Sequence, residues 1–244
     1  MSNFAYTETI DRDKAFFEED EFRHQIKVLR RRPGDYLDFI DGQGKTYKGR
    51  IQAVDNLKKR LQVEITECDI CQKPLPLQLV VALPKSSKID TIIQKSVELG
   101  VTRITPLVTS RTVVRIDSKE KSTTRCLHWH RVAVASLKQS GNPFLPLIDK
   151  PTALLDLEKS GDRTSPIDKI VFHPQTPEPF SETVRTLNKN AATRLLLGPE
   201  GGLSEDEIVF LRSQGYIVSS LGKRIMRLET AVVSALTLVQ FVKS

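Results

Sequence analysis

The sequence predicts an α/β protein with a small β-rich module over residues 1–72, a linker at 73–77 and a larger parallel-sheet domain over 78–244. Three observations support this division. Short alternating apolar and polar segments dominate the first part, and apolar runs alternate with helical patterns in the last part. Between them, Pro74 and Pro76 make a stiff extended link, because proline disfavours helix in the residue before it.

The first module is expected to be barrel-like, because its apolar residues alternate as they do in half-buried strands. Residues 36–40 and 47–54 alternate on either side of a glycine-bearing turn at 41–44, which is typical of a hairpin. Residues 60–66 predict a further strand with one apolar face. One helix is expected over residues 21–31, ahead of a proline-glycine turn.

The second part alternates strands with helices, which implies a largely parallel sheet. Residues 77–83 form a continuous apolar run that suits a strand buried on both faces. Residues 87–99 carry apolar side chains at helical spacing and stop at Gly100. A long helix is expected to bury the face that contains Trp129 and Leu137. Further strands are expected at 103–108, 169–172, 194–197 and 216–220.

The composition is that of an ordinary soluble globular protein, with 39% hydrophobic and 27% charged residues. No apolar run reaches the roughly 18 residues that a membrane-spanning helix needs. The first residues lack the basic and apolar regions of a signal peptide. We therefore expect a cytoplasmic protein.

The three cysteines cannot all pair with one another, so no disulfide framework is expected. Cys68 and Cys71 have C-x-x-C spacing, which fits either two small side chains near a domain boundary or half of a zinc site. The nearest candidates for the other half are Cys126, His128 and His130, far along the chain on a predicted helix. No metal is expected.

The net charge of +7 is concentrated in the middle of the chain. Residues 1–77 carry 14 Lys/Arg against 14 Asp/Glu, residues 78–150 carry 12 against 5, and residues 151–244 carry 11 against 11. Such a local excess favours a polyanionic partner through counterion release, and a solvated basic surface is the alternative. The first segment also contains a local basic cluster over residues 23–32.

A glycine-rich loop follows the predicted strand at 194–197. Residues 198–202 contain three glycines and a proline, and Ser204 and Glu207 have capping-box spacing for the next helix. Open α/β sheets bind ligands beyond the carboxyl ends of their strands, where glycine lets a ligand approach the backbone. A tight turn without a ligand is the alternative.

A second glycine-bearing loop, residues 221–227, follows the predicted strand at 216–220, with Arg227 and Glu229 flanking the start of an apolar helix. Alone, this arrangement fits a surface ion pair and a helix cap equally well. Two such loops at adjacent strand ends are a more specific signal of a pocket. Residues 198–202 match neither common phosphate-gripping loop, so a neutral pocket for adenosine with a zwitterionic tail is favoured.

Several ordered motifs together resemble the RsmE family, bacterial methyltransferases that modify N3 of a uridine in small-subunit (16S) ribosomal RNA. The motifs are Gly-Pro-Glu-Gly-Gly at 198–202, Leu-Gly-x-x-Ile-Met-Arg-x-Glu-Thr-Ala at 221–231 and Glu-Leu-Gly-Val-Thr-Arg-Ile-Thr-Pro-Leu at 98–107. The resemblance also takes in Lys85, residues 111–114 and residues 139–141, and it runs over essentially the whole chain. Asn142 departs from it, because the family usually has an arginine there.

The resemblance implies an N-terminal PUA-like barrel that helps to grip RNA and a C-terminal SPOUT domain with a deep trefoil knot, a rare exception to unknotted folds. It also implies a homodimer that binds S-adenosylmethionine and acts in ribosome biogenesis. His173 is expected at the pocket rim, although a histidine satisfied in the core or merely solvated fits the sequence as well. The implied cofactor-pocket residues are His173, Leu197, Gly198, Glu200, Gly201, Gly202, Leu221, Gly222, Ile225, Met226, Arg227 and Ala231.

Three residues are candidates for catalysis. Arg227 is expected to stabilise the developing uridine anion at O2 or O4. Glu229 is expected to orient Arg227 or to accept a proton through water, and Thr230 to cap the helix or donate a hydrogen bond. RNA, alone or in the assembled or assembling 30S subunit, is expected to bind Arg23, Lys27, Arg30, Arg31, Arg32, Lys85, Lys88, Lys95, Arg111 and Arg115. Two alternatives are a SPOUT enzyme for another RNA position and an inactive RNA-binding assembly factor.

Overall fold

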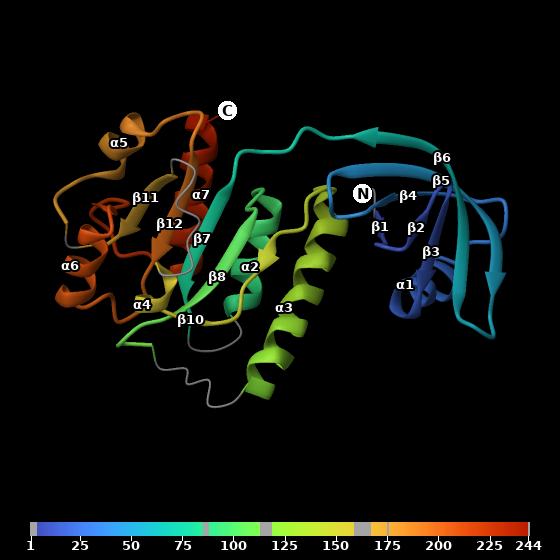
Figure 1. The fold of residues 1–244 in the computed structure, drawn as a ribbon, viewed down its shortest axis with the longest axis horizontal. Helices are drawn as coiled ribbons and strands as arrows, with labels where there is room; N and C mark the ends of the chain where they lie inside the picture. The colour runs from blue at the N-terminus through green and yellow to red at the C-terminus, as the bar shows by residue number, and fades with distance from the viewer. Residues whose placement is uncertain (1–3, 85–87, 113–118, 159–166, 175, 244) are drawn as a thin grey trace. The chain divides into compact units, whose positions relative to one another are not determined.

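The computed structural model describes residues 4–84, 88–112, 119–158, 167–174 and 176–243 (Figure 1). The chain forms two compact units. The first consists of Met1–Lys73 and Val134–Leu145, and the second of Pro74–Ala133 and Pro146–Ser244. A segment far along the chain therefore packs with the N-terminal module.

The first unit contains a six-stranded sheet in the order β1-β4-β5-β6-β3-β2. β1 pairs with β4 in parallel, and the other neighbours are antiparallel. The predicted hairpin is confirmed, because the Asp41 carboxylate accepts the backbone N–H groups of Gln43 and Lys45 and closes the turn between β4 and β5. The strands are β1 (Ala5–Tyr6), β2 (Ile10–Asp11), β3 (Lys14–Glu18), β4 (Tyr36–Ile40), β5 (Lys45–Asp55) and β6 (Arg60–Ile70).

The helix predicted over residues 21–31 differs from the observed one. Residues Glu19–Arg23 form α1, and His24–Val28 continue it as a π-helical segment, η1. Phe22 and Gln25 lie three positions apart and so on one face of the helix, and both are buried. The helix ends before residue 31 because Arg30 adopts a left-handed φ of 55°.

The second unit contains a parallel sheet in the order β10-β8-β7-β12-β11-β13, with β9 also paired to β8. The predicted parallel α/β fold is confirmed. The long central strands match the predicted apolar runs, whereas the two-residue strands β9 and β10 carry no pattern that sequence reasoning detects. The strands are β7 (Leu77–Ala82), β8 (Arg103–Val108), β9 (Leu147–Ile148), β10 (Thr152–Ala153), β11 (Ile167–Phe172), β12 (Ala192–Leu197) and β13 (Ile217–Ser219).

Helices cover the parallel sheet, and the sheet's residues alternate between two apolar surfaces. Val80, Val171 and Leu196 belong to one buried cluster with apolar side chains of α4 and α6. Helices α2 and α7 pack against each other, and α7 also contacts β12 (Figure 1). The helices of this unit are α2 (Lys88–Glu98), α3 (Lys119–Ser140, shared with the first unit), α4 (Leu154–Leu157), α5 (Phe180–Thr183) with the 3-10 turn η2 (Val184–Thr186), α6 (Glu205–Ser213) and α7 (Leu228–Lys243).

The central strands leave a position suited to ligand binding. From β7 the chain passes through α2 to β8 on one side, and from β12 it passes through α6 to β13 on the other. β7 and β12 are hydrogen-bonded neighbours, so the strand order changes direction between them. Such a point creates a crevice beyond the carboxyl ends of the strands.

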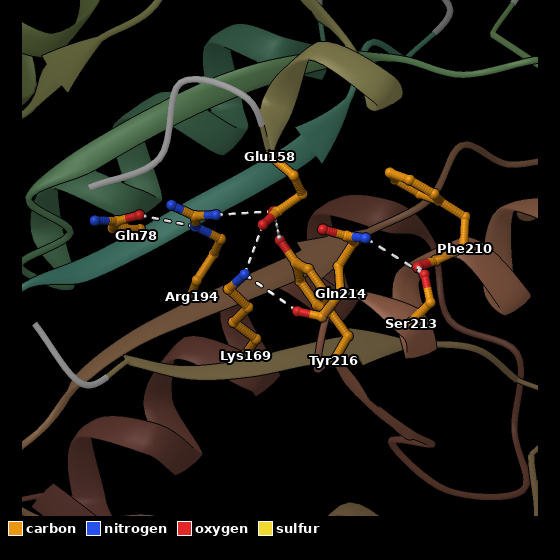
Figure 2. Close-up of polar contacts among 8 residues, drawn as sticks. All are labelled: Gln78, Glu158, Lys169, Arg194, Phe210, Ser213, Gln214 and Tyr216. Carbon is orange, nitrogen blue, oxygen red and sulfur yellow. Dashed lines mark hydrogen bonds and ion pairs between the residues drawn. The ribbon is translucent and has the colours of Figure 1, made fainter. Parts of the chain in front are cut away.

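A buried polar cluster lies near the amino ends of β7, β11 and β12 (Figure 2). Oε1 of Glu158 accepts hydrogen bonds from Arg194 Nη1 at 3.0 Å and from the Tyr216 hydroxyl at 2.9 Å. Its other oxygen, Oε2, accepts one from Lys169 Nζ at 2.5 Å. The guanidinium of Arg194 also donates from Nε to Gln78 Oε1 at 2.9 Å. One carboxylate thus ties α4 to two strands and to the segment before β13.

One carboxylate serves two cations in this cluster. Burial alone raises the pKa of the Glu158 carboxyl, but the hydrogen bonds from Lys169 and Tyr216 and the nearby cations hold that pKa below its ordinary value. Burial also raises the pKa of Tyr216, so its hydroxyl keeps the proton that it donates. The cluster therefore satisfies charges that would be costly if left unpaired.

Within the residues that the structure describes, none of the helices combines the length and the apolar character that crossing a bilayer requires.

Candidate functional site

A cavity of about 310 Å³ opens beyond the carboxyl ends of β11 and β12 and along the start of α7. Every residue that the sequence assigned to a cofactor pocket lines this cavity except Gly201. Lys88 and Phe172 line it as well, and sequence reasoning gave neither of them this place. Phe172 was detectable as the last residue of a strand, and Lys88 as the start of the helix after β7.

The first glycine loop forms one wall of the cavity. Two of its positions require glycine, Gly198 for lack of room and Gly202 because of its backbone conformation. A Cβ atom on Gly198 would lie 2.8 Å from Cγ of Leu203, which is buried beneath the loop. Gly202 adopts a left-handed φ of 72°, and its N–H donates to the carbonyl of Pro199 at 2.8 Å. At these two positions the loop presents bare backbone to the cavity, and Glu200 and Leu203 line it as well.

The capping box predicted after this loop is confirmed. The Ser204 hydroxyl accepts from the Glu207 N–H at 3.2 Å, and Oε2 of Glu207 accepts from the Ser204 N–H at 2.8 Å. Both interactions satisfy backbone donors at the start of α6 that have no partner within the helix. They fix the point at which the loop ends.

The second loop forms the opposite wall, with Met226 half-buried and Ile225 88% exposed. The side chain of Arg227 lines the cavity and is exposed, and its carbonyl accepts the Ala231 N–H at 2.9 Å in the first turn of α7. Thr230 is exposed in the same turn. The structure thus brings Arg227 to the cavity, whereas Glu229 and Thr230, in the first turn of α7, are not among the residues that line it.

Charged groups meet at the mouth of the cavity. Lys88 Nζ lies 3.7 Å from Glu200 Oε1 and 4.0 Å from Glu229 Oε2. In the described part of the chain, the ion pair of Glu229 is thus with Lys88, whereas the sequence suggested that Glu229 orients Arg227. Oε2 of Glu229 and Nδ1 of His173 are buried and lack a hydrogen-bond partner among the described residues. Buried polar atoms in that state indicate groups that a ligand or water satisfies.

The residues predicted to bind RNA fall into three groups. Arg23, Lys27, Arg30 and Arg32 are exposed on the first unit, where Arg31 Nη1 donates to the carbonyl of Tyr36 at 2.7 Å. On the second unit, Lys88 lines the cavity, Lys95 pairs with Glu98 at 2.9 Å, and Arg111 contacts the first glycine loop. Lys85 and Arg115 lie outside the described residues.

The described residues contain no group of three or more side chains suited to holding a metal ion. Cys68 is exposed and Cys71 half-buried, and both have free thiols. On α3, an imidazole nitrogen of His128 lies 2.8 Å from Oδ2 of Asp90, so this ring already has a partner on α2.

Comparison with known proteins matches both parts of the chain. A model described as an RNA methyltransferase domain matches residues 71–240, and one described as an RNA methyltransferase PUA domain matches residues 17–66. The ribosomal RNA small subunit methyltransferase E of Bacillus subtilis is 30% identical over 230 residues, which are 91% of this chain and 88% of that protein.

Two solved structures share the fold over almost their full length. The ribosomal RNA small subunit methyltransferase E of Neisseria gonorrhoeae, bound to S-adenosylmethionine, has a TM-score of 0.84 and 26% identity, covering 99% of this chain and 98% of that one. A Legionella pneumophila protein in complex with bound S-adenosylmethionine has a TM-score of 0.86 and 28% identity over the same shares of the two chains. The chain therefore belongs to the RNA methyltransferase family, as the resemblance in its sequence motifs indicated.

Proposed function

We propose that this protein methylates N3 of a uridine in small-subunit (16S) ribosomal RNA with S-adenosylmethionine as the methyl donor. The observation that carries this proposal is the glycine-walled cavity at the carboxyl ends of the strands, in a chain of the RNA methyltransferase family. Relatives named for small-subunit ribosomal RNA support the substrate, and two similar structures with bound S-adenosylmethionine support the donor.

The residues of the cavity fit this donor. Phe172, Leu203 and Met226 offer apolar surface for an adenine ring, and the backbone of the first loop allows close approach. The carboxylate of Glu200 and Nδ1 of His173, which has no hydrogen-bond partner in the described part of the chain, offer polar contacts for the ribose or the amino-acid tail. When bound, S-adenosylmethionine supplies a methyl group on a sulfonium, which a ring nitrogen attacks directly without metal or covalent enzyme intermediate.

The chain's own contribution is to position the uridine and to manage its N3 proton. Arg227, exposed at the cavity, is our candidate for stabilising negative charge at O2 or O4 as the proton leaves. The buried Oε2 of Glu229, 4.0 Å from Lys88 Nζ, is our candidate proton acceptor, directly or through water. Thr230, exposed in the same helical turn, is our candidate hydrogen-bond donor.

The exposed basic residues 23–32 on the first unit are our candidates for RNA contact, together with Lys88 and Lys95. The PUA domain match supports an RNA-binding role for the first unit. We further propose that the protein acts in the cytoplasm as a homodimer on free ribosomal RNA or on the assembled or assembling 30S subunit. The trefoil knot expected from the resemblance stays a prediction.

Two measurements test the proposal. Calorimetry with S-adenosylmethionine is expected to show binding to the purified protein, and the absence of heat would favour an inactive assembly factor. Mass mapping of ribosomal RNA nucleosides from a deletion strain is expected to show one missing 3-methyluridine, restored by the wild-type gene. Loss of a methyl group at another RNA position would identify a different substrate within the same enzyme class.

A further inference from the structure

The segment that follows β8 contacts the outer side of the first glycine loop. Arg111 Nη1 donates a hydrogen bond to the carbonyl of Gly201 at 2.8 Å and a longer one to the carbonyl of Leu203 at 3.4 Å. Hydrogen bonds from a charged donor are about twice as strong as neutral ones. Arg111 therefore holds two backbone positions of a loop about ninety residues away in the sequence.

A second contact beside it fixes the same loop at its end. The backbone N–H of Ser110 donates to Glu207 Oε1 at 2.8 Å, while Oε2 of the same carboxylate caps α6 through Ser204. The contacting segment is itself a closed turn, because the Thr112 N–H donates to the carbonyl of Thr109 at 3.1 Å. The end of the loop and the turn that supports it are thus joined through one side chain.

The geometry separates the two sides of the loop. Gly198, Glu200 and Gly202 line the cavity, whereas Gly201 does not. A Cβ atom on Gly201 would lie 3.6 Å from Cβ of Arg111, so this glycine faces the arginine closely. Arg111 itself does not line the cavity, and its shorter hydrogen bond goes to Gly201, the one glycine of the loop that does not line it either.

We infer that Arg111 is a positioning residue for the cofactor loop, and not one of the RNA contacts. By holding the carbonyls of Gly201 and Leu203, it keeps the loop in the shape that a ligand of the cavity needs before the ligand arrives. This inference rests on the proposed function, because the ligand is taken to be S-adenosylmethionine. It reassigns one of the ten basic residues that the sequence alone placed on RNA.

Two variants and one matched control test the inference. Arg111→Met keeps the aliphatic packing but removes the donors, and Arg111→Lys keeps the charge and one donor group. Arg131→Met removes an exposed arginine on α3, away from the cavity. Affinity for S-adenosylmethionine is measured by calorimetry without RNA, and affinity for a small-subunit ribosomal RNA fragment is measured separately at several salt concentrations.

We expect Arg111→Met to bind S-adenosylmethionine about tenfold more weakly, which corresponds to about 1.4 kcal/mol. Arg111→Lys is expected to recover part of this loss, and Arg131→Met to bind as the wild type does. RNA affinity and its salt dependence are expected to stay unchanged in Arg111→Met, and the KM for S-adenosylmethionine to rise more than kcat falls.

Other outcomes would overturn the inference. If Arg111→Met binds S-adenosylmethionine normally but loses RNA affinity and flattens its salt dependence, Arg111 is an RNA contact. If Arg111→Met fails to fold, Arg111→Gln takes its place, because it removes the charge and shortens the side chain. Wild-type cofactor affinity with weakened RNA binding in that variant refutes the positioning role. A wild-type protein that does not bind S-adenosylmethionine would instead refute the proposed function, so the two failures are distinguishable.

Discussion

Replacing Glu158 by glutamine removes the negative charge at the centre of the buried cluster (Figure 2). The carboxylate accepts from Arg194 and Tyr216 on one oxygen and from Lys169 on the other, so an amide must turn its NH₂ group toward a donor. Both cations are then buried without a counter-charge. Breaking such a pair costs roughly 3–5 kcal/mol. For a chain of this size that corresponds to a melting temperature lower by roughly 6–20 °C, at about 2–4 °C for each kcal/mol.

The assay is urea or thermal unfolding at pH 7 followed by the fluorescence of Trp129, the only tryptophan in the sequence, which is buried in the second unit. The matched control is Glu98→Gln, which removes an ion pair with the partly exposed Lys95 and is expected to cost at most about 1 kcal/mol. If Glu158→Gln and Glu98→Gln lower the free energy of unfolding equally, the reasoning that burial makes the Glu158 cluster important is refuted.

The same comparison predicts a pH dependence. Because the folded-state pKa of Glu158 is lowered, its charged form contributes stability above the unfolded-state pKa, about 4.3. That contribution is lost as the pH falls through the lower folded-state pKa. The stability difference between wild type and Glu158→Gln is therefore expected to be largest near neutral pH and to shrink below about pH 4. A difference that grows on acidification would show that the sign is wrong.

Three further predictions concern the site and its surroundings. Ser204→Ala removes half of the confirmed capping box and is expected to lower the free energy of unfolding by about 1 kcal/mol in urea titrations, and a change near zero would show that the cap is dispensable. Arg227→Ala is expected to lower kcat at least about tenfold with cofactor and RNA affinities kept, and a wild-type rate would remove Arg227 from the mechanism. Lys27→Glu is expected to weaken RNA binding and flatten its salt dependence with unchanged cofactor affinity, whereas equal RNA binding would exclude this surface.

The core strands and both loops were predictable because their signals are local. A strand buried on both faces needs a continuous apolar run, and β7 carries one at 79–82 and β12 at 195–197. The turn at residues 198–202 needs glycine where Cβ has no room, and the capping box needs Ser204 and Glu207 three positions apart. The two-residue strands and the π-helical segment η1 were not predictable, because they depend on packing partners elsewhere in the chain.

The site was predictable as a list of residues but not as a set of contacts. The motifs placed nearly all of the residues assigned to the pocket around one cavity, because each follows the end of a parallel strand. They did not reveal that Glu229 meets Lys88, because these residues lie on α7 and α2, two helices that the packing of the sheet brings together. Lys88 was assigned to RNA from its charge alone, and the structure adds its pairs with Glu200 and Glu229 at the cavity.

By itself, the sequence determined the fold class, the two glycine loops and the family, because periodicity, glycine placement and motif order are properties of neighbouring residues. Only the tertiary structure decided what Arg111 does. A charged residue after β8 is equally suited to RNA or to a backbone carbonyl, and the choice depends on which segment the sheet places beside it. The fold places Gly201 and Leu203 within hydrogen-bonding reach, and a hydrogen bond between segments so far apart along the chain has no sequence signal.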